Sequence, residues 1–560
     1  MDQAEATVEG RPQGDRSNNG RWLEWADWRA TLILVLGILA LRIVYLIWLN
    51  PWELVEDEAH YWEWSRRLAL SYYSKGPGIA TIIAASTWLF GVSEWAIRLP
   101  AALSSLIGAL VLARLTIDAF GDERAGFLAA LSFNLIAIFQ FEGQIMTIDP
   151  PFMALWLVCA WIAWHAFAAH RRGDSPWLLW ALLGLALGAG FLVKYIIVLL
   201  PPGLLLYAFI RRRSLPWDRR MTAAVGLALV TFAVALTPWV VWNAQHGWPA
   251  IAHELGHLGA PGGDTPPRWG DRHALISMLE MVGSQIGVMG PPAFVLIVLA
   301  TVSAFRERPR RPDRWPRHLF MLSCAVPTLA FFLLLSLIST VEGNWPVSAY
   351  LTLLVLVGER SVVEIPRWFE RRKRWLCDAR AVLRAGGSPR RKPRSAWVTG
   401  WRWMIGWGLV TATIIAWPHG WARLPVIGDA LPMDRIDGGR EIAAEVDELR
   451  RQLRVRTGEE PLVIGGAYGL AGQLAFYLED RPTVYGADSY LRWRETQYDY
   501  WEETDLSDPA LRGRPAVMVC RDAEKWLEAF EFETFGTLNE DIPIHVGLGF
   551  GGPAPPAEDD

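Results

Sequence analysis

Two acidic residues and a lysine lie close together in a polar, aromatic stretch that directly follows the first long apolar segment. The stretch, residues 55–77, reads VEDEAHYWEWSRRLALSYYSKGP and holds Asp57, Glu58 and Lys75. A carboxylate can accept the proton of an attacking hydroxyl group, and a cation stabilises charge that develops on a phosphate. These residues therefore favour group transfer from a phosphate leaving group. Simpler interpretations stay open, because Asp57 could be only a helix N-cap and a loop lysine is usually only solvated.

Further polar residues interrupt later apolar segments. Asp149 stands in TIDPPF, Lys194 in GFLVKYIIVLL, and Glu342 and Asn344 in STVEGNWPVSAY. Ionisable groups within apolar segments are costly and are therefore candidates for function. Structural roles remain open for two of them. Asp149 precedes Pro150 and could cap a helix, and Lys194 could extend its ammonium group to the headgroup region.

A second motif indicates different chemistry. The letters HELGH, with His253, Glu254 and His257, match the H-E-x-x-H pattern that binds zinc on a helix, with the glutamate as general base. The following GAPGGDTPPRWGD cannot continue a helix, and no third ligand is obvious, although Asp264 and His273 are nearby. A zinc hydrolase is therefore an alternative. The simpler interpretation is a loop segment whose side chains contact a headgroup or a sugar.

These candidates are distributed over a chain with the composition of a membrane protein. Of its 560 residues 52% are hydrophobic, and they come in blocks. Many of the 32 tryptophans lie near the ends of these blocks, as in interfacial belts. With a shorter run at 79–90, the pattern predicts a polytopic α-helical protein with about 11–13 transmembrane helices. The segments of spanning length are 30–49, 95–118, 124–142, 150–169, 176–192, 195–210, 221–242, 285–305, 319–339, 345–358 and 400–417.

Basic residues predict the orientation of these segments, because lysine and arginine are enriched in cytoplasmic loops. Arginines follow the segments that end at 169, 210 and 305, and residues 360–394 are densely basic. With eleven spans and an inner N-terminus, all four basic regions lie in the cytoplasm. The opposite loops then lie outside, namely 50–94, 143–149, 243–284, 340–344 and everything after 417.

The stretch 51–78 is predicted to lie on the outer membrane surface. Tyr61, Trp64, Leu68 and Tyr72 recur at helical spacing and form one stripe, which is typical of an interfacial amphipathic helix. The acidic residues at its start are favoured by the helix dipole. We therefore expect this helix to lie flat on the outer leaflet and to hold the reacting groups at headgroup depth.

The two ends of the chain lie outside the apolar segments. Residues 1–29 are polar and lack a signal-peptide pattern, which predicts a cytoplasmic tail before a transmembrane domain at 30–418. In residues 419–560, short apolar strands such as PLVIGG and PAVMVC alternate with helical patterns such as REIAAEVDELRRQLR. This alternation predicts a small extracytoplasmic α/β domain. Its end, GGPAPPAEDD, is predicted to be disordered.

Taken together, the motifs resemble a known family, the polytopic glycosyltransferases of the protein O-mannosyltransferase superfamily (glycosyltransferase family 39 type). This resemblance implies the GT-C fold. The similarity is greatest to the bacterial branch that includes the lipid A aminoarabinose transferases, and it extends over about residues 30–501. The matching stretches are DEAHYWEWSRRLA, YYSKGP, MTIDPPF, GFLVKY, WNAQHGW and VEGNWPVSAY, with AGQLAFYLEDRPTVYG and RETQYDYW in the tail.

The resemblance implies roles for individual residues. Asp57, with Glu58 beside it, would orient or deprotonate the acceptor hydroxyl, and Asp149 would be the second acidic position. Lys75 would meet the donor phosphate. Lys194 would be the buried lysine near the donor.

Five more residues would line the substrate cavity by the same resemblance: His60, Tyr61, Tyr72, Glu342 and Asn344. The chain departs from the aminoarabinose branch in two places. His60 stands where that branch typically has arginine, and the letters SKGP replace its Glu-Lys-Pro. Some GT-C enzymes use a divalent metal, but no D-x-D pattern lies at the site, so we expect no obligate metal and predict no metal ligands.

The resemblance also implies an activity. The chain would be an inverting glycosyltransferase of the bacterial inner membrane that takes one sugar from undecaprenyl monophosphate. The acceptor hydroxyl, on a glycolipid such as lipid A, a polysaccharide or a protein, would lie on the periplasmic side. Membrane lipids are expected partners and nucleic acid is not. The alternatives are a zinc hydrolase and a non-catalytic transporter of lipid or polysaccharide.

Overall fold

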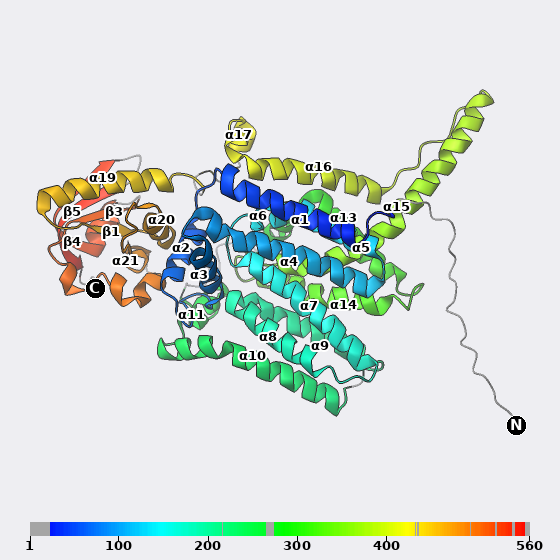
Figure 1. Ribbon diagram of the computed structural model, residues 1–560, viewed down its shortest axis with the longest axis horizontal. Coiled ribbons are helices and arrows are strands. Elements are labelled where there is room, and N and C mark those ends of the chain that lie inside the picture. Colours follow the sequence, from blue (N-terminus) through cyan, green and yellow to red (C-terminus); the bar gives the residue numbers. More distant parts are fainter. Residues whose placement is uncertain are drawn as a thin grey trace.

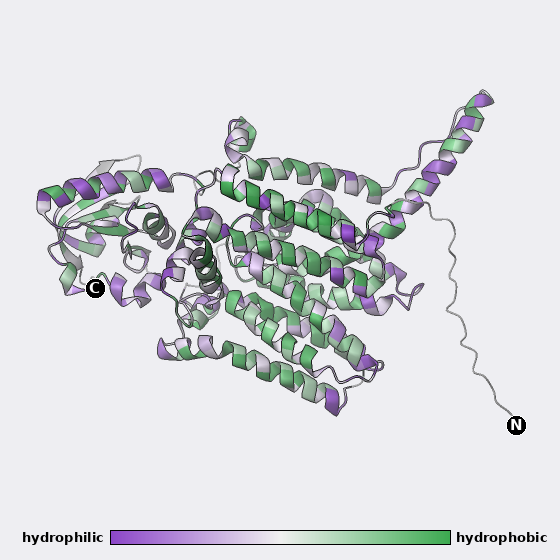
Figure 2. Cartoon of the chain, in the orientation of Figure 1, coloured by the Kyte–Doolittle hydropathy of each residue, from purple (hydrophilic) through white to green (hydrophobic). Residues whose placement is uncertain are grey.

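The computed structural model describes residues 23–215, 217–264, 274–429, 431, 433, 436–492, 494–520, 523–539 and 544–554. The helices that precede residue 417 form one elongated block, and the tail packs against one end of this block (Figure 1). The long helix α15, Val347–Arg384, projects from the opposite end. Hydrophobic residues dominate the block, whereas hydrophilic residues gather at its ends and along the projecting part of α15 (Figure 2).

Within the described residues, five helices are long and apolar enough to cross a membrane, and a sixth span results if a pair bent by 105° counts as one. That pair is α12 and α13. Shorter apolar helices complete the block, so the chain is a multi-pass membrane protein. The elements of the block are α1 (Trp28–Val44), η1 (Tyr45–Leu49), α3 (Gly78–Phe90), α4 (Glu94–Phe120), α5 (Glu123–Leu135), α6 (Ala137–Glu142), α7 (Asp149–Arg171), α8 (Trp177–Val193), η2 (Tyr195–Leu199), α9 (Leu200–Ile210), α10 (Arg219–Gln245), α12 (Ala274–Met289), α13 (Pro291–Glu307), α14 (Trp315–Leu335), α15 and α16 (Ala396–Ala416).

Several predicted segments are not single straight helices. Segment 124–142 is divided at Ile136, whose backbone is extended, into α5 and α6. Segment 285–305 falls across the bend between α12 and α13. Segment 345–358 is only the first part of α15. Breaks at membrane depth are tolerated where the freed backbone groups are buried in protein, a condition that hydropathy along one segment cannot reveal.

One such break positions a candidate residue. Helix α8 ends at Val193, and Lys194 is extended, with φ −150° and ψ 123°, before η2 begins. The loop that carries Lys75 packs directly against this break. A Cβ atom on Gly76 would lie 2.4 Å from the carbonyl oxygen of Leu192, so only glycine permits the approach. The two lysine-bearing segments are therefore held together at the C-terminal end of α8.

The aromatic face of helix α2 (Glu56–Arg66), predicted to face the outer leaflet, is covered by protein instead. All residues from Glu58 to Trp64 are buried, because α2 contacts α3 and also the tail helix α20 (Tyr468–Tyr477). The helix ends at Arg66, so Leu68 and Tyr72 lie beyond it rather than on its stripe. Protein covers faces of α2 that the pattern assigned to lipid and water.

The tail forms a mixed five-stranded sheet in the order β2-β1-β3-β5-β4. Strands β2, β1 and β3 are parallel, and β5 pairs antiparallel with β3 and β4. The α/β prediction is confirmed, but residues 551–553, assigned to a disordered end, belong to β5, whereas 555–560 lie outside the described residues. The tail elements that carry this description are α19 (Gly439–Thr457), β1 (Leu462–Gly465), α20, β2 (Tyr485–Gly486), β3 (Ala516–Val519), β4 (Phe530–Asn539) and β5 (Ile544–Pro553).

Hydrogen bonds fix the tail domain to the segment that leads into α2. The Tyr477 hydroxyl accepts from the Leu54 backbone N–H at 2.6 Å, and the Gln473 amide donates to the Leu54 carbonyl at 2.9 Å. The Arg440 backbone N–H donates to Glu53 Oε2 at 3.0 Å. Because these bonds join α20 and the start of α19 to the residues just before α2, the tail is placed directly over the candidate residues of α2.

Candidate active site

Asp57 lies where α2, the helix block and the tail domain meet. It is in the first turn of α2, and the Tyr468 hydroxyl, from the start of α20, donates to its Oδ1 at 3.3 Å. Burial raises the pKa of the Asp57 carboxyl, and the Tyr468 hydrogen bond opposes this rise. The charges of Glu56 and Asp149 also raise this pKa, and Lys75 lowers it. Asp57 is thus within electrostatic reach of Lys75 and Asp149, and a raised pKa suits a proton acceptor.

Asp149 joins three segments that are far apart in the sequence. Its Oδ1 lies 2.5 Å from Lys194 Nζ, and its Oδ2 accepts from the Asn344 amide at 2.9 Å. The side chains of Asp149 and Lys194 are 9% and 6% exposed, respectively. Asp149 is the first residue of α7, and Ile148 is the capping position, so the cap interpretation does not hold. Lys194 is paired inside the protein and does not snorkel.

Lys75 reaches the same region from the loop after α2. Its Nζ lies 3.1 Å from Glu254 Oε1, and it is 5.6 Å from the centre of the Tyr195 ring. Its side chain is only 15% exposed. Lys75 is therefore a partly buried, ion-paired group and not merely a solvated loop lysine. A phosphate that approached Lys75 would also approach the Glu254 carboxylate.

Glu58, predicted beside Asp57, points into the protein. Arg98 on α4 binds both of its oxygens, with a shortest distance of 2.6 Å, and both side chains are fully buried. The Met146 backbone N–H donates to the same carboxylate at 2.8 Å. All of these contacts are with protein groups, which favours a role for Glu58 in positioning α2 rather than in the reaction.

The two predicted tyrosines differ in their surroundings. Tyr72 is fully buried, stacks on Trp64 with ring centres 4.4 Å apart, and donates to the Trp64 carbonyl at 3.0 Å. It therefore supports the loop. Tyr61 is near the reacting groups, since burial and then the charges of Asp57 and Asp149 raise its pKa. Only Tyr61 is thus placed to contact a substrate beside Asp57.

His60 packs α2 against the tail and is not a free cation. Its Nε2 accepts from Trp64 Nε1 at 3.1 Å, and its ring centre lies 4.7 Å from that of Tyr468. Burial lowers the pKa of His60 to about 3, so the imidazole is neutral at ordinary pH. It does not supply the positive charge of the arginine that the aminoarabinose branch has at this position.

The outer turn before α15 contributes one of its two predicted residues. Asn344 binds Asp149, whereas Glu342 is exposed. Glu142 is not among the predicted residues, yet it is buried, accepts from the Thr147 hydroxyl at 3.0 Å, and interacts electrostatically with Asp149. The sequence does hold a feature that could have identified Glu142, because this acidic residue ends the apolar segment 124–142.

The HELGH motif lies on a helix, α11 (Pro249–His257), which ends at the motif itself. His253 Nδ1 lies 2.7 Å from Asp264 Oδ2, and its Nε2 lies 3.1 Å from His257 Nε2. Glu254 is paired with Lys75. Across the described residues, no group of three or more His, Cys, Asp or Glu side chains is arranged to hold a metal. His273, considered as a third ligand, lies outside the described residues.

Sequence comparison identifies relatives for much of the chain. Residues 74–242 match the family described as dolichyl-phosphate-mannose-protein mannosyltransferase. The lipid A galacturonosyltransferase RgtD of Rhizobium johnstonii is 29% identical over 59% of this chain and 64% of its own length. The undecaprenyl phosphate-α-4-amino-4-deoxy-L-arabinose arabinosyl transferase 2 of Pseudomonas fluorescens is 29% identical over 39% of each chain. The matched part thus spans less than two thirds of either relative.

Structure comparison extends the similarity to nearly the whole chain. ArnT of Cupriavidus metallidurans in its apo state superposes with a TM-score of 0.57 and 18% identity, over 92% of this chain and 98% of ArnT. The same protein bound to undecaprenyl phosphate gives a TM-score of 0.56 and 17% identity, over 93% and 98%. At such identity the match establishes the fold. The predicted fold class is therefore confirmed, and the sequence matches agree with the family resemblance.

Proposed function

Because the chain is a GT-C-fold relative of a lipid A galacturonosyltransferase and of aminoarabinose transferases, we propose that it transfers one sugar from undecaprenyl monophosphate. The acceptor is a hydroxyl group on lipid A or a similar glycolipid. The reaction takes place at the outer face of the bacterial inner membrane, with the tail domain in the periplasm. The arginines at the end of α7 and directly after α9, distant from the tail in Figure 1, support this orientation.

One observation carries the proposal, namely that carboxylates and cations from separate segments meet at one end of the helix block. Asp57 comes from α2, Lys75 from the following loop, and Asp149 and Lys194 from α7 and the break after α8. A candidate proton acceptor, Asp57, and two candidate cations for the phosphate, Lys75 and Lys194, are thus present together. A lipid-linked donor presents its phosphate at this depth.

The arrangement favours direct displacement. The acceptor oxygen attacks the anomeric carbon while Asp57 takes the hydroxyl proton. The bond between the anomeric carbon and the phosphate oxygen breaks, and undecaprenyl phosphate leaves with the bonding electron pair. Lys75 and Lys194 stabilise its negative charge. A single displacement inverts the anomeric configuration, so no covalent sugar–enzyme intermediate is expected.

The donor site can be tested by mass spectrometry of lipids that co-purify in mild detergent. Wild-type protein is expected to retain an undecaprenyl-phosphate sugar, and Lys75→Ala is expected to lose it, because the cation at the phosphate is removed. Lys373→Ala, which changes an exposed lysine of α15, should retain the donor. Equal retention by the Lys75 and Lys373 variants would refute the phosphate role of Lys75.

A second variant tests Glu254, the carboxylate that competes with the donor phosphate for Lys75. Glu254→Gln removes the carboxylate that is paired with Lys75 and that would repel the donor phosphate. Retention of undecaprenyl phosphate is expected to increase roughly five-fold, the effect of about 1 kcal/mol. Titration of undecaprenyl phosphate into purified protein measures the change, with the exposed Glu459→Gln as control.

The zinc alternative predicts a different result for the same variant. If Glu254 were the general base of a zinc hydrolase, Glu254→Gln would abolish activity and would not strengthen lipid binding. Weaker binding of undecaprenyl phosphate by this variant would count against the proposed competition at Lys75.

A further inference from the structure

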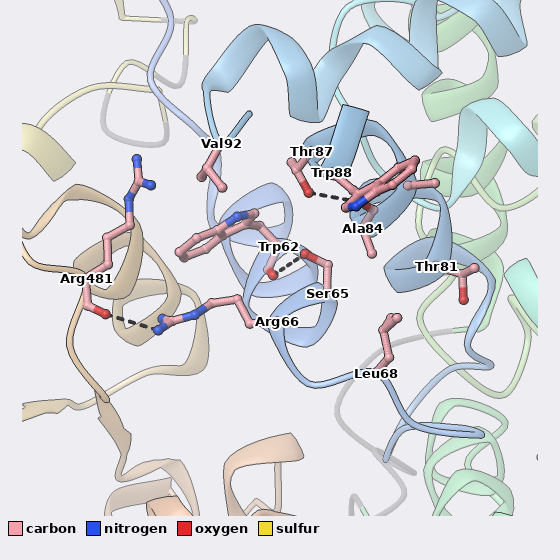
Figure 3. Close-up of a pocket in the computed structure, with 11 residues that line it drawn as sticks. Trp62, Ser65, Arg66, Leu68, Thr81, Ala84, Thr87, Trp88, Val92 and Arg481 are labelled. Carbon is pink, nitrogen blue, oxygen red and sulfur yellow. Dashed lines mark hydrogen bonds between the residues drawn. The ribbon is translucent and has the colours of Figure 1, made fainter. Parts of the chain in front are cut away.

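A cavity separate from the proposed active site opens between α2, α3 and the tail domain. Its volume is about 670 Å³. Figure 3 shows side chains from α2 and α3 and from the tail loop after α20 directed toward one another around it. The residues Asp57, Lys75 and Asp149 are not part of its lining. The cavity therefore needs an explanation other than donor binding.

The α2 side of the cavity carries Arg66, whose carboxylate partner is shared. Arg66 lies 3.0 Å from Glu63, which also binds Arg67 at 2.5 Å, and Arg67 is paired with Glu503 as well, at 3.0 Å. Arg66 Nη2 further donates to the carbonyl oxygen of Arg481 at 3.0 Å, which brings the two arginines together (Figure 3).

Arg481 adds an unbalanced charge from the tail. No carboxylate among the residues that the structure describes pairs with it; its guanidinium group lies 5.3 Å from the ring centre of Phe476 and 5.9 Å from that of Trp62. Burial, and then the charge of Arg66, lower the pKa of Arg481. Its φ of +47° is unusual for a residue other than glycine. An anion between Arg66 and Arg481 would relieve their repulsion.

The opposite wall of the cavity is apolar and continues into surface that faces lipid. It is formed by α3, where Ala84 and Ala85 leave space and Trp88 stands at the rim. Trp88 is 83% exposed, and the next residues, Leu89 and Phe90, are 63% and 50% exposed. Exposed tryptophan and apolar side chains near the end of a membrane domain are typical of the interfacial region of a bilayer.

We infer that this cavity binds the headgroup of an anionic glycerophospholipid, with its phosphate between Arg66 and Arg481 and its acyl chains along the exposed face of α3. The charge of Arg481 beside Arg66 complements the phosphate, and the apolar wall continues into the bilayer, which a soluble anion would not use. Because Arg66 belongs to α2 and Arg481 to the tail, the lipid joins these two parts at the membrane surface. This binding site does not depend on the proposed reaction.

The inference can be tested by native mass spectrometry of protein equilibrated with equal amounts of phosphatidylglycerol and phosphatidylcholine. Wild-type protein is expected to retain phosphatidylglycerol preferentially. Arg66→Gln/Arg481→Gln should lower this preference about 25-fold, since each basic group near an anionic headgroup contributes about five-fold. Arg451→Gln/Arg456→Gln removes the same charge from exposed positions on α19 and should keep the preference.

A further variant separates a pocket from a diffuse positive surface. Ala85→Trp fills the cavity without changing any charge, and it is expected to abolish the preference for phosphatidylglycerol. The inference is overturned if Ala85→Trp keeps the full preference, because binding then does not use the cavity. It is also overturned if the Arg66/Arg481 and Arg451/Arg456 double variants lose the preference equally, since binding then follows net charge alone.

Discussion

Asp57→Asn is expected to lower the rate of sugar transfer about 100- to 10,000-fold, the usual contribution of a positioned general base. The replacement keeps the size of the side chain and an oxygen that can accept from the Tyr468 hydroxyl, so the local structure should persist. It removes only the group that takes the acceptor proton. Turnover of an undecaprenyl-phosphate sugar, followed by mass spectrometry, measures the change. Donor retention should remain at the wild-type level, which distinguishes loss of the base from loss of the phosphate site.

The pH dependence of the wild-type rate provides a second readout of the same variant. Burial raises the pKa of Asp57, and the residue accepts a proton only as a carboxylate. The rate should therefore fall as the pH is lowered through this raised pKa, at higher pH than for an ordinary aspartate. In Asp57→Asn the residual rate should lack this acidic decline.

The adjacent glutamate offers a matched control. Glu56 is exposed in the same first turn of α2, so Glu56→Gln removes an equal charge from nearly the same place and should preserve most of the rate. Near-normal turnover by correctly folded Asp57→Asn would instead show that Asp57 is not the general base. Persistence of the acidic decline in that variant would assign the titration to another group.

The sequence predicts the helix block well, because long apolar segments have few alternatives to spanning a membrane. It also predicts the meeting of Asp149, Lys194 and Asn344, since the order of the segments places all three on the same side of the membrane. The helix breaks that bring these residues into contact are harder to predict from the sequence. The extended backbone at Lys194 and the close approach of Gly76 to Leu192 depend on packing between segments more than 100 residues apart.

The surroundings of α2 show more clearly what the sequence pattern cannot predict. Its aromatic stripe has the pattern of a helix on a membrane, but α20, about 400 residues later, covers it. The sequence pattern therefore does not identify Tyr468 as the hydrogen-bond partner of Asp57. Amphipathic periodicity reports that a face is apolar. It does not report whether lipid or another domain covers that face.

Glu58→Ala is expected to lower the free energy of unfolding by about 3–5 kcal/mol, the usual effect of breaking a buried ion pair. The Arg98 guanidinium would remain fully buried, with only the Trp52 and Glu53 carbonyl groups, at 2.9 and 2.6 Å, as acceptors. A cation without its carboxylate is far more costly there than at a surface. Thermal unfolding of the purified protein in detergent measures the loss, with Glu56→Ala as the exposed control.

Variants of the same ion pair distinguish between two roles for Glu58, positioning of α2 and participation in the reaction. If it positions α2, Glu58→Gln should lower the unfolding temperature together with the rate, because the charge that holds Arg98 is lost. Combining it with Arg98→Met should restore part of the stability, since the unpaired cation is then removed as well. If Glu58 instead takes part in the reaction, Glu58→Gln should abolish turnover at an unchanged unfolding temperature. The contacts of Glu58 with Arg98 and with the Met146 backbone favour the first result, because a carboxylate so fully bonded has no free oxygen to offer a substrate.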